Sequence, residues 1–452
     1  MQRLLHALID LVVNTFFRRI DVAGLEYVPQ VGPVIFAGNH PNALMDGFLL
    51  INKCGRWPIH FMANSKLWKY PLLGSLLDAL GAVPVYRREE HDGDVDNSVA
   101  FERLYEVIES GQCMGIFPEG ISHAESQLVK LKTGAARIAL SVSARGRKIV
   151  KIVPCGLTYI HRHRFRSQVL LEFGTPIAVA DEWVRAYSED EAGTVRRLTD
   201  HLAEALANVT LNAPDWRTLR FIQAARRLYK PATARLSPSG YVDLSRRFID
   251  RYLAAIDDPE LRSFRDEVED YQSRLDFLGL KDHQLRQPIS VLATIRKLLA
   301  RCLMMIVLLP LAIPGAVLHL PVGWVAAWVG DKFSYEQDDV ATLKVISTLL
   351  LLPLIYLGVA FMVGNAFGLV WGIATALLLP LSFLFSVRVI EAEAGLLISI
   401  LSLLRVTRLP GDVAELREQR AELVAKIRKL ADRLADPSQE RVFGPGDFRN
   451  QA

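Results

Sequence analysis

The feature that most restricts this chain is a run of 43 residues, Val345–Val387, without Asp, Glu, Lys, Arg or His. One membrane-spanning helix needs about 20 apolar residues, so the run is long enough for two. Gly364 and Asn365 lie at its midpoint and are predicted to form the turn between them. A buried core helix of a soluble protein is a poor explanation at this length. The run therefore predicts a hairpin of two transmembrane helices.

A second apolar run, residues 302–330, contains His319 but no Asp, Glu, Lys or Arg. Its prolines fit either one kinked span or a re-entrant hairpin, and Trp324 and Trp328 suit a membrane–water interface. Basic residues lie on both sides of the two apolar runs of the predicted membrane region 296–390: Arg296, Lys297 and Arg301 precede the first run along the chain, and Arg388, Arg405 and Arg408 follow the second. This pattern places both flanks, and with them the chain that precedes the membrane region, on the cytoplasmic face.

The composition excludes several classes of protein. Apolar residues make up 51% of the chain, which rules out a disordered polypeptide. The formal net charge of +4 is dispersed, which suits an anionic membrane surface or a phosphate-bearing substrate better than a nucleic acid. The four cysteines form no CxxC pair, so we expect reduced, buried thiols and no metal site.

Residues 20–180 alternate strand-like and helix-like stretches. This alternation predicts an α/β domain with a mostly parallel or mixed sheet flanked by helices. The expected strands are 34–37, 60–63, 83–86, 114–117, 149–154 and 169–173, with helices that include 99–110 and 134–144.

The rest of the chain has a helical pattern. Residues 1–19 form an amphipathic helix that fits a membrane surface and its own domain equally well. Residues 181–295 are charged and Arg-rich, and predict a helical insert. The cytosolic tail, residues 391–452, has heptad-spaced apolar residues at 412–434. These favour a helix packed on its own domain over a coiled coil, because Arg420 interrupts the seam.

The segment VIFAGNHPNALMD carries the clearest chemistry. An apolar strand ends near Gly38, and Pro41 suits the first position of a helix, which leaves His40 just outside it. Asp46 can then fold back to His40. A carboxylate on one imidazole nitrogen fixes the tautomer, and the other nitrogen can take a proton from an alcohol. A histidine that only caps the helix is the structural alternative.

Two further segments end strands with polar residues. In MGIFPEGISH, Glu119 follows a strand, and Gly120 and Ser122 allow close backbone approach to a polar substrate group. A simple β-turn is the alternative. In GAVPVYRR, Arg87 and Arg88 end another strand, and one of them could bind a phosphate, to which Lys130 and Lys132 could contribute. Isolated basic residues on a solvated surface are the alternative.

The order NHPNALMD, GAVPVYRR, FPEGIS, IVPCGL over residues 20–180 resembles the PlsC-like glycerolipid acyltransferase family. The resemblance implies that His40 is the catalytic base and that Asp46 orients it. It also implies that Arg87, Glu119 and Gly120 hold the phosphate end of the acceptor. Five residues rather than the family's usual four separate the His from the Asp. This longer gap looks like the fungal-type branch, which acylates glycerol-3-phosphate and dihydroxyacetone phosphate. Segments 212–231, 278–283 and 339–345 resemble its helical insert and the approach to its membrane hairpin.

The resemblance implies a membrane-bound O-acyltransferase of phospholipid biosynthesis. The donor would be acyl-CoA or acyl-carrier protein, the acceptor glycerol-3-phosphate, and the other partners membrane lipids, with no metal and no cofactor. Backbone N–H groups at the helix N-terminus are expected to stabilise the oxyanion. Lysophosphatidate is the alternative acceptor. A non-catalytic membrane lipid-binding protein is a more distant alternative.

Overall fold

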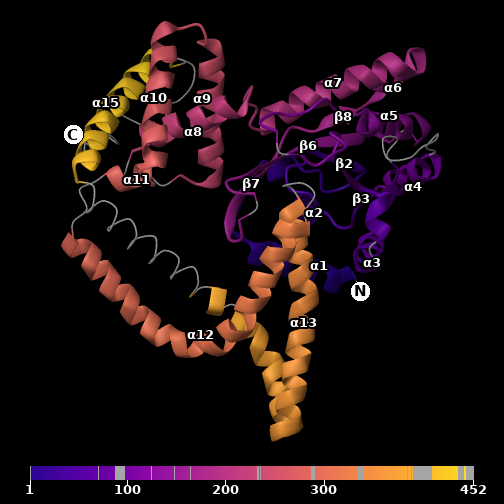
Figure 1. The fold of residues 1–452 in the computed structure, drawn as a ribbon. Helices are drawn as coiled ribbons and strands as arrows, with labels where there is room; N and C mark the ends of the chain where they lie inside the picture. Colours follow the sequence, from indigo (N-terminus) through magenta and orange to yellow (C-terminus); the bar gives the residue numbers. More distant parts are fainter. Residues whose placement is uncertain are drawn as a thin grey trace. The chain divides into compact units, whose positions relative to one another are not determined.

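The computed structural model describes residues 2–443 except 70, 87–96, 124, 147, 163, 232, 233, 235, 287–290, 334–338, 384, 388, 390–409 and 436–441 (Figure 1). The chain forms two compact units. The first consists of Met1–Trp216, Leu236–Arg246 and Tyr335–Thr342, and the second of Arg217–Arg235, Arg247–Ser334 and Leu343–Ala452.

A mixed eight-stranded sheet forms the centre of the first unit, as the sequence predicted. The strands are β1 (Phe17–Ala23), β2 (Val34–Gly38), β3 (Ile59–Asn64), β4 (Val83–Val85), β5 (Cys113–Ile116), β6 (Val150–Tyr159), β7 (Ser167–Phe173) and β8 (Ile177–Val179). Their order is β1-β7-β6-β2-β5-β3-β4, and β8 also pairs with β6. Neighbours from β6 through β2, β5 and β3 to β4 are parallel, whereas β7 and β8 run antiparallel to β6.

The helices of this unit are α1 (Gln2–Phe16), α2 (Leu44–Lys53), α3 (Pro71–Ala79), α4 (Ser98–Glu109), α5 (Gly134–Gly146), α6 (Asp181–Glu189) and α7 (Glu191–Val209). Every residue of β2 is buried, because a parallel strand in mid-sheet is covered on both faces. On one face Ile35 and Ile152 of the sheet pack with Ile138 of α5 and Leu198 of α7 in one apolar cluster.

All six expected strands are present, and β6 extends to Tyr159. The sequence pattern missed β1, whose Arg18, Arg19 and Asp21 obscure its period, and the three-residue β8. The predicted start of α2 was wrong. The helix begins at Leu44, and residues 41–43 form a turn rather than a first helical turn that starts at Pro41.

Helix α1 packs on its own domain through one face, which buries Ile9, Val12, Val13 and Phe16. A second stripe of the same helix, Leu4, Leu8 and Leu11, is exposed. Helical spacing places three leucines at i, i+4 and i+7 on one side. The membrane-surface role of this helix stays a prediction.

The second unit is helical, and α8 (Trp216–Tyr229), α9 (Pro238–Ala254) and α13 (Asp339–Phe367) begin within the first unit. Its other described helices include α10 (Pro259–Phe277), α11 (Asp282–Leu285), α12 (Val291–Phe333) and α15 (Pro410–Arg433). Helix α15 packs on α10 and α11, with Val413, Leu416, Leu423, Ile427 and Leu430 buried. The helix predicted in the tail thus packs on other helices of the second unit. Arg420, which interrupts the seam, pairs with the buried Asp282 at 2.8 Å.

Within the described residues, two helices are long and apolar enough to cross a membrane: Val340–Phe367 and Leu369–Val387. The break between them lies at Gly368, whose φ of 101° favours glycine, so the turn predicted at Gly364-Asn365 was wrong. Gly364 instead lies where the two helices approach closely. A Cβ added to Gly372 would lie 3.0 Å from the Cα of Gly364. Small residues permit such close packing of apolar helices.

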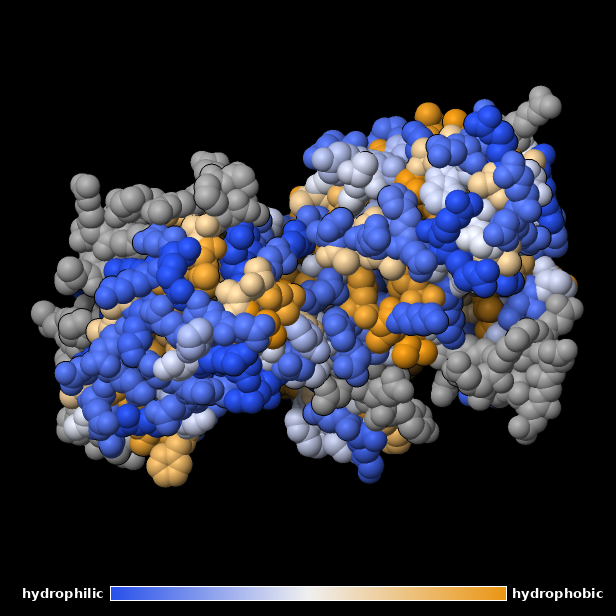
Figure 2. All heavy atoms as spheres, turned by 90° about the horizontal axis from the view of Figure 1, so that it is seen from above, coloured by the Kyte–Doolittle hydropathy of each residue, from blue (hydrophilic) through white to orange (hydrophobic). Residues whose placement is uncertain are grey.

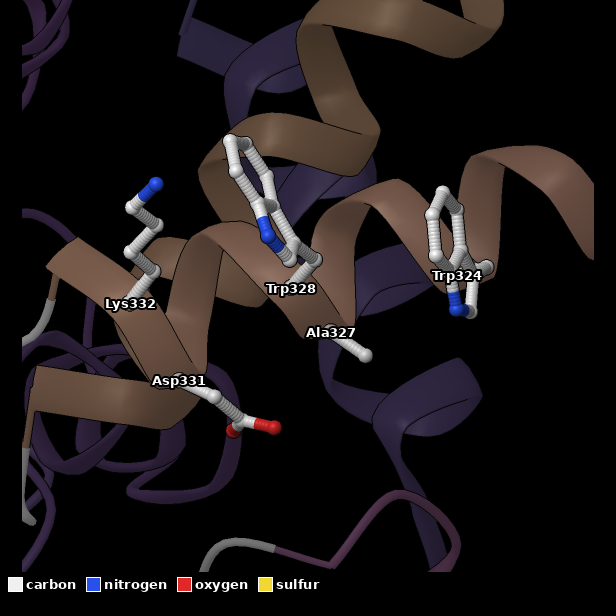
Figure 3. Close-up of a pocket in the computed structure, with 5 residues that line it drawn as sticks. All are labelled: Trp324, Ala327, Trp328, Asp331 and Lys332. Atoms are coloured by element: carbon white, nitrogen blue, oxygen red, sulfur yellow. The ribbon is translucent and has the colours of Figure 1, made fainter.

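Helix α12 is a single helix that includes the whole second apolar run, without a return loop. Near its end Trp324, Ala327, Trp328, Asp331 and Lys332 line a surface hollow (Figure 3). Both indoles are exposed, and the Lys332 ammonium lies 4.9 Å from the ring centroid of Trp328. Figure 2 shows hydrophobic side chains in patches on a largely hydrophilic face. The interfacial role of the tryptophans and the number of membrane crossings stay predictions.

Candidate active site

The candidate site lies at one edge of the sheet in the first unit. Strands β6, β2 and β5 are parallel neighbours, so their carboxyl ends meet at the same edge. His40 follows β2 by two residues, Glu119 follows β5 by three, and Tyr159 is the last residue of β6. The sheet therefore brings together residues that are far apart in the sequence.

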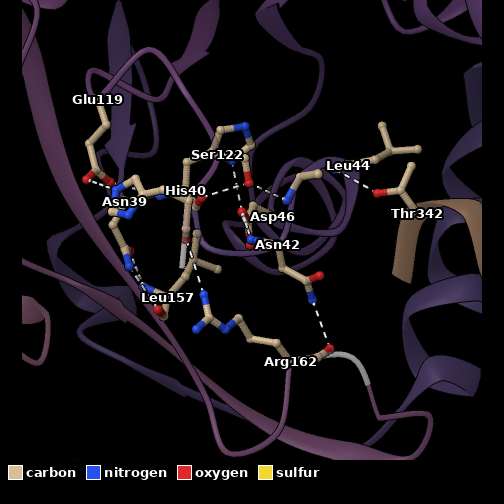
Figure 4. A network of polar contacts seen from close by, with 12 residues as sticks. Asn39, His40, Asn42, Leu44, Asp46, Glu119, Ser122, Leu157, Arg162 and Thr342 are labelled. Atoms are coloured by element: carbon tan, nitrogen blue, oxygen red, sulfur yellow. Dashed lines mark hydrogen bonds and ion pairs between the residues drawn. The ribbon is translucent and has the colours of Figure 1, made fainter. Parts of the chain in front are cut away.

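His40 and Asp46 form the predicted pair. The His40 Nδ1 atom lies 2.9 Å from Asp46 Oδ2, and the two side chains are 19% and 0% exposed (Figure 4). The His40 ring stacks on Phe117 with 4.0 Å between ring centroids. The five-residue gap is accommodated by the turn before α2, where Ala43 has a φ of 41°. An alanine rarely adopts that conformation, so the turn is strained.

Two further donors hold the Asp46 carboxylate. The Asn42 backbone N–H donates to Oδ2 at 2.7 Å, and the Tyr159 hydroxyl donates to Oδ1 at 2.5 Å. Burial and the neighbouring Asp46 raise the pKa of Tyr159 well above its ordinary value, so the phenol keeps its proton. Because Asp46 acts as acceptor, this network assigns the proton of the His40 imidazole to Nδ1. Nε2 is then the nitrogen that can take a proton.

The backbone of His40 is also fixed. Its N–H donates to Glu119 Oε1 at 3.1 Å, and its carbonyl accepts from the Ser122 hydroxyl at 2.9 Å. The second Glu119 oxygen accepts from the Val129 N–H at 3.0 Å and from His123 Nε2. The hydrogen bond to Glu119 raises the pKa of His123. Glu119 and Ser122, two of the five predicted substrate-binding residues, thus hold the turn that carries His40, and their contact with substrate stays a prediction.

The turn after β5 depends on Gly120. Its φ is 75°, and an added Cβ would lie 2.7 Å from Cδ of the Lys132 side chain. Only glycine combines that backbone conformation with this close approach. Lys132 is exposed beside the turn, as a phosphate-binding residue would need to be. Arg87 lies outside the described residues, so its predicted place in the site is untested.

Three residues of the site were missed in the sequence. Asn39 exchanges two hydrogen bonds with the backbone of Leu157, at 2.7 and 3.0 Å, and so ties the end of β2 to β6. Tyr159 contacts Asp46 as described above. Arg162 donates from Nη1 to the His123 carbonyl at 3.2 Å, and its backbone oxygen accepts from Asn42 Nδ2 at 3.3 Å. The signal was present in GLTYIHRHR, which continues the fourth motif block into a basic loop.

The N-terminus of α2 does not supply the oxyanion site that was predicted there. The Asn42 N–H donates to Asp46. The Ala43 N–H donates to the Ser122 hydroxyl at 3.1 Å, and the Leu44 N–H donates to the Thr342 hydroxyl at 3.3 Å. These three amides are engaged by the protein itself. The prediction treated the helix end as open, but side chains from distant segments satisfy it.

A mixed α/β sheet with a His–Asp pair at the carboxyl ends of its strands is an arrangement suited to acid–base chemistry. Residues 19–158 match the family model described as Acyltransferase. Residues 221–439 match the model of the glycerol-3-phosphate acyltransferase 2 C-terminal domain.

The chain is also similar to individual proteins. An uncharacterised acyltransferase of Schizosaccharomyces pombe is 30% identical over 94% of this chain and 80% of its own length. Glycerol-3-phosphate O-acyltransferase 2 of Saccharomyces cerevisiae is 36% identical over 58% of this chain, but the match spans only 37% of the yeast protein. The crystal structure of PlsC, a 1-acyl-sn-glycerophosphate acyltransferase from Thermotoga maritima, has a TM-score of 0.32 at 21% identity and covers 44% of this chain and 79% of that one.

The chain belongs to the PlsC-like glycerolipid acyltransferase family, and its C-terminal half matches the C-terminal domain of glycerol-3-phosphate acyltransferase 2. The sequence resemblance to this family is thereby confirmed.

Proposed function

We propose that this protein is a membrane-bound O-acyltransferase that transfers a fatty acyl group from acyl-CoA or acyl-carrier protein to a hydroxyl of glycerol-3-phosphate. The observation that carries the proposal is the pair of His40 and the buried Asp46, with Nδ1 held by the carboxylate. The yeast glycerol-3-phosphate O-acyltransferases among its relatives support this acceptor.

The chemistry follows from the geometry of the pair. His40 Nε2 takes the proton of the acceptor hydroxyl as its oxygen attacks the thioester carbonyl. The tetrahedral intermediate collapses, the C–S bond breaks, and the imidazolium returns the proton to the leaving thiolate. Asp46 stabilises the imidazolium in between. The acyl group moves directly to the acceptor, so the protein needs no covalent intermediate.

The phosphate of the acceptor needs cations near His40. Arg162 and Lys132 are the side chains that we assign to it, and Arg87 joins them on the strength of the sequence motif. Arg162 is held beside the site by the His123 carbonyl, and its guanidinium lies 5.8 Å from the ring centroid of Trp216. A guanidinium offers five donors in a planar fork that matches phosphate oxygens. An anchored phosphate would position the hydroxyl for attack.

The two apolar helices, Val340–Phe367 and Leu369–Val387, would hold the enzyme in the bilayer that receives its product. Basic residues flank this region on both sides in the sequence, which supports a catalytic unit on the cytoplasmic face. Membrane lipids are then its immediate surroundings.

The test is an acyl-transfer assay on the full chain in detergent, with labelled acyl-CoA and either glycerol-3-phosphate or lysophosphatidate. We expect product from glycerol-3-phosphate, none from His40→Ala, and a strong loss with Asp46→Asn. His201→Ala is the matched control, because His201 is an exposed histidine on α7. Its transfer rate should equal that of the wild type.

Product from lysophosphatidate alone would replace the proposed acceptor. If neither acceptor gives product, the acyl-carrier-protein thioester is offered in place of acyl-CoA, because the proposal includes either acyl donor. Normal turnover by folded His40→Ala protein with any substrate pair would refute the mechanism.

A further inference from the structure

Tyr159 belongs to the candidate site through its hydroxyl. Tyr159 ends β6, and its ring packs against Phe17 with 5.7 Å between ring centroids. Its hydroxyl donates to Asp46 Oδ1 at 2.5 Å. Asp46 is completely buried. The sheet therefore brings to the Asp46 carboxylate a phenol that lies 113 residues later in the sequence.

The two oxygens of Asp46 have different partners. Oδ2 accepts from the Asn42 N–H and from His40, whereas Tyr159 is the described donor to Oδ1. A carboxylate with one bonded oxygen can rotate about its Cβ–Cγ bond. A carboxylate with donors on both oxygens is held in one plane, and a buried acceptor left without a donor is costly. Tyr159 thus completes the set of contacts that orients Asp46 toward Nδ1.

We propose that Tyr159 is a positioning residue of the acyl-transfer reaction, which holds Asp46 in the orientation that keeps His40 ready to accept a proton. This inference rests on the proposed function. The hydroxyl also draws part of the carboxylate charge to Oδ1, and so sets how strongly Asp46 stabilises the imidazolium. Because burial and Asp46 raise its pKa, Tyr159 remains a donor throughout the pH range of an assay.

Other charged groups around the pair must be considered before a pH profile is interpreted. Arg162 lies close enough to act on the charge of both Tyr159 and His123. Glu119 contacts the backbone of His40 and the His123 ring. A Phe at position 159 leaves all of these side chains in place, so a change in the profile reports the lost hydroxyl.

The experiment compares Tyr159→Phe with Tyr271→Phe. Tyr271 is the control in the helical unit, because its hydroxyl likewise donates to a buried aspartate, Asp282, at 3.1 Å. Both variants lose one hydrogen bond to a buried aspartate. A purely structural role predicts the same outcome for both: lower thermal stability, with the kcat and pH profile of the remaining folded enzyme unchanged.

For Tyr159→Phe we expect kcat to fall about 10- to 100-fold, the size of effect that small misplacement of catalytic groups produces. KM for the acceptor should stay within about twofold, since the reacting groups and not the binding groups are affected. The acidic limb of the kcat/KM profile should move to higher pH, because the carboxylate charge then acts more strongly on the imidazolium. In an Asp46→Asn background, Tyr159→Phe should cause no further loss.

A wild-type kcat and pH profile in Tyr159→Phe would overturn the inference, as would full additivity with Asp46→Asn. Failure of the proposed function is distinguishable, because it appears as absent transfer by the wild type. In that case the pH dependence of carbethoxylation of His40 by diethyl pyrocarbonate, followed by peptide mass spectrometry, replaces turnover. A curve that moves to higher pH in Tyr159→Phe supports the inference, and an unchanged curve overturns it.

Discussion

Glu119→Gln tests whether this glutamate fixes His40 or contacts the substrate. The carboxylate is 2% exposed and accepts from the backbone N–H groups of His40 and Val129, and from His123. Glutamine keeps one acceptor oxygen and replaces the other with a donor. One backbone N–H then faces an NH2 group, and the other loses a charged acceptor. A hydrogen bond to a charged group contributes about 1.5–3 kcal/mol, so the variant should lose roughly 2–4 kcal/mol.

The same change should affect the reaction through the position of His40. We expect kcat to fall about 10- to 100-fold, because a displaced base no longer reaches the hydroxyl. KM for glycerol-3-phosphate should not change. Thermal unfolding and steady-state kinetics of detergent-solubilised enzyme measure both effects. Glu102→Gln is the control, since Glu102 is an exposed glutamate paired with Arg145. A raised KM with normal kcat and normal unfolding temperature would refute this reasoning and make Glu119 a substrate contact.

Three further predictions concern stability. Ala43→Gly should relieve a strained φ of 41° and so stabilise the first unit by about 1 kcal/mol. A fluorescence melt should show this as a higher unfolding temperature. Asp282→Asn should destabilise the second unit by about 3–5 kcal/mol, because the buried carboxylate is the counter-charge of Arg420 and Arg286, and hydrogen exchange at α15 should rise. The hydrogen bond from Arg433 lowers the pKa of Asp258 from its ordinary value of 3.8 to about 2. The Asp258 carboxylate should therefore stabilise the contact with α15 at pH values above 3.8 and cease to do so as the pH falls toward about 2. Exchange at α15 in Asp258→Asn should lack that acid-dependent step.

The apolar strands were predictable because each is a short run bounded by turn residues. β2 is the clearest case, with five buried residues that end at Gly38. The pairing of His40 with Asp46 also followed from the sequence, since a residue outside the helix can meet one inside it. β1 was not predictable in the same way. Arg18 and Arg19 of this edge strand are exposed and mask its apolar pattern, so that only its pairing with β7 identifies it.

The contacts that depend on distant segments could not be predicted. No residue near Asp46 in the sequence indicates that Tyr159 contacts it, because the pairing of strands β2 and β6 brings the two residues together. The predicted oxyanion site failed for the same reason. Side chains from two remote segments occupy the amides that a helix N-terminus would otherwise offer. Arg420 is the third example, since its partner Asp282 lies 138 residues earlier.

Two of these distant contacts hold the turn that accommodates the longer His–Asp gap. The turn at Ala43 that accommodates the gap is strained, and strain persists only where the surroundings hold it. Ser122 binds the Ala43 N–H, and Thr342 binds the Leu44 N–H. These two side chains come from FPEGIS and DVATLKV, the third motif block and the approach to the apolar hairpin. The five-residue gap, the serine and the threonine therefore act as one unit: a change in any of them should alter the orientation of Asp46 toward His40.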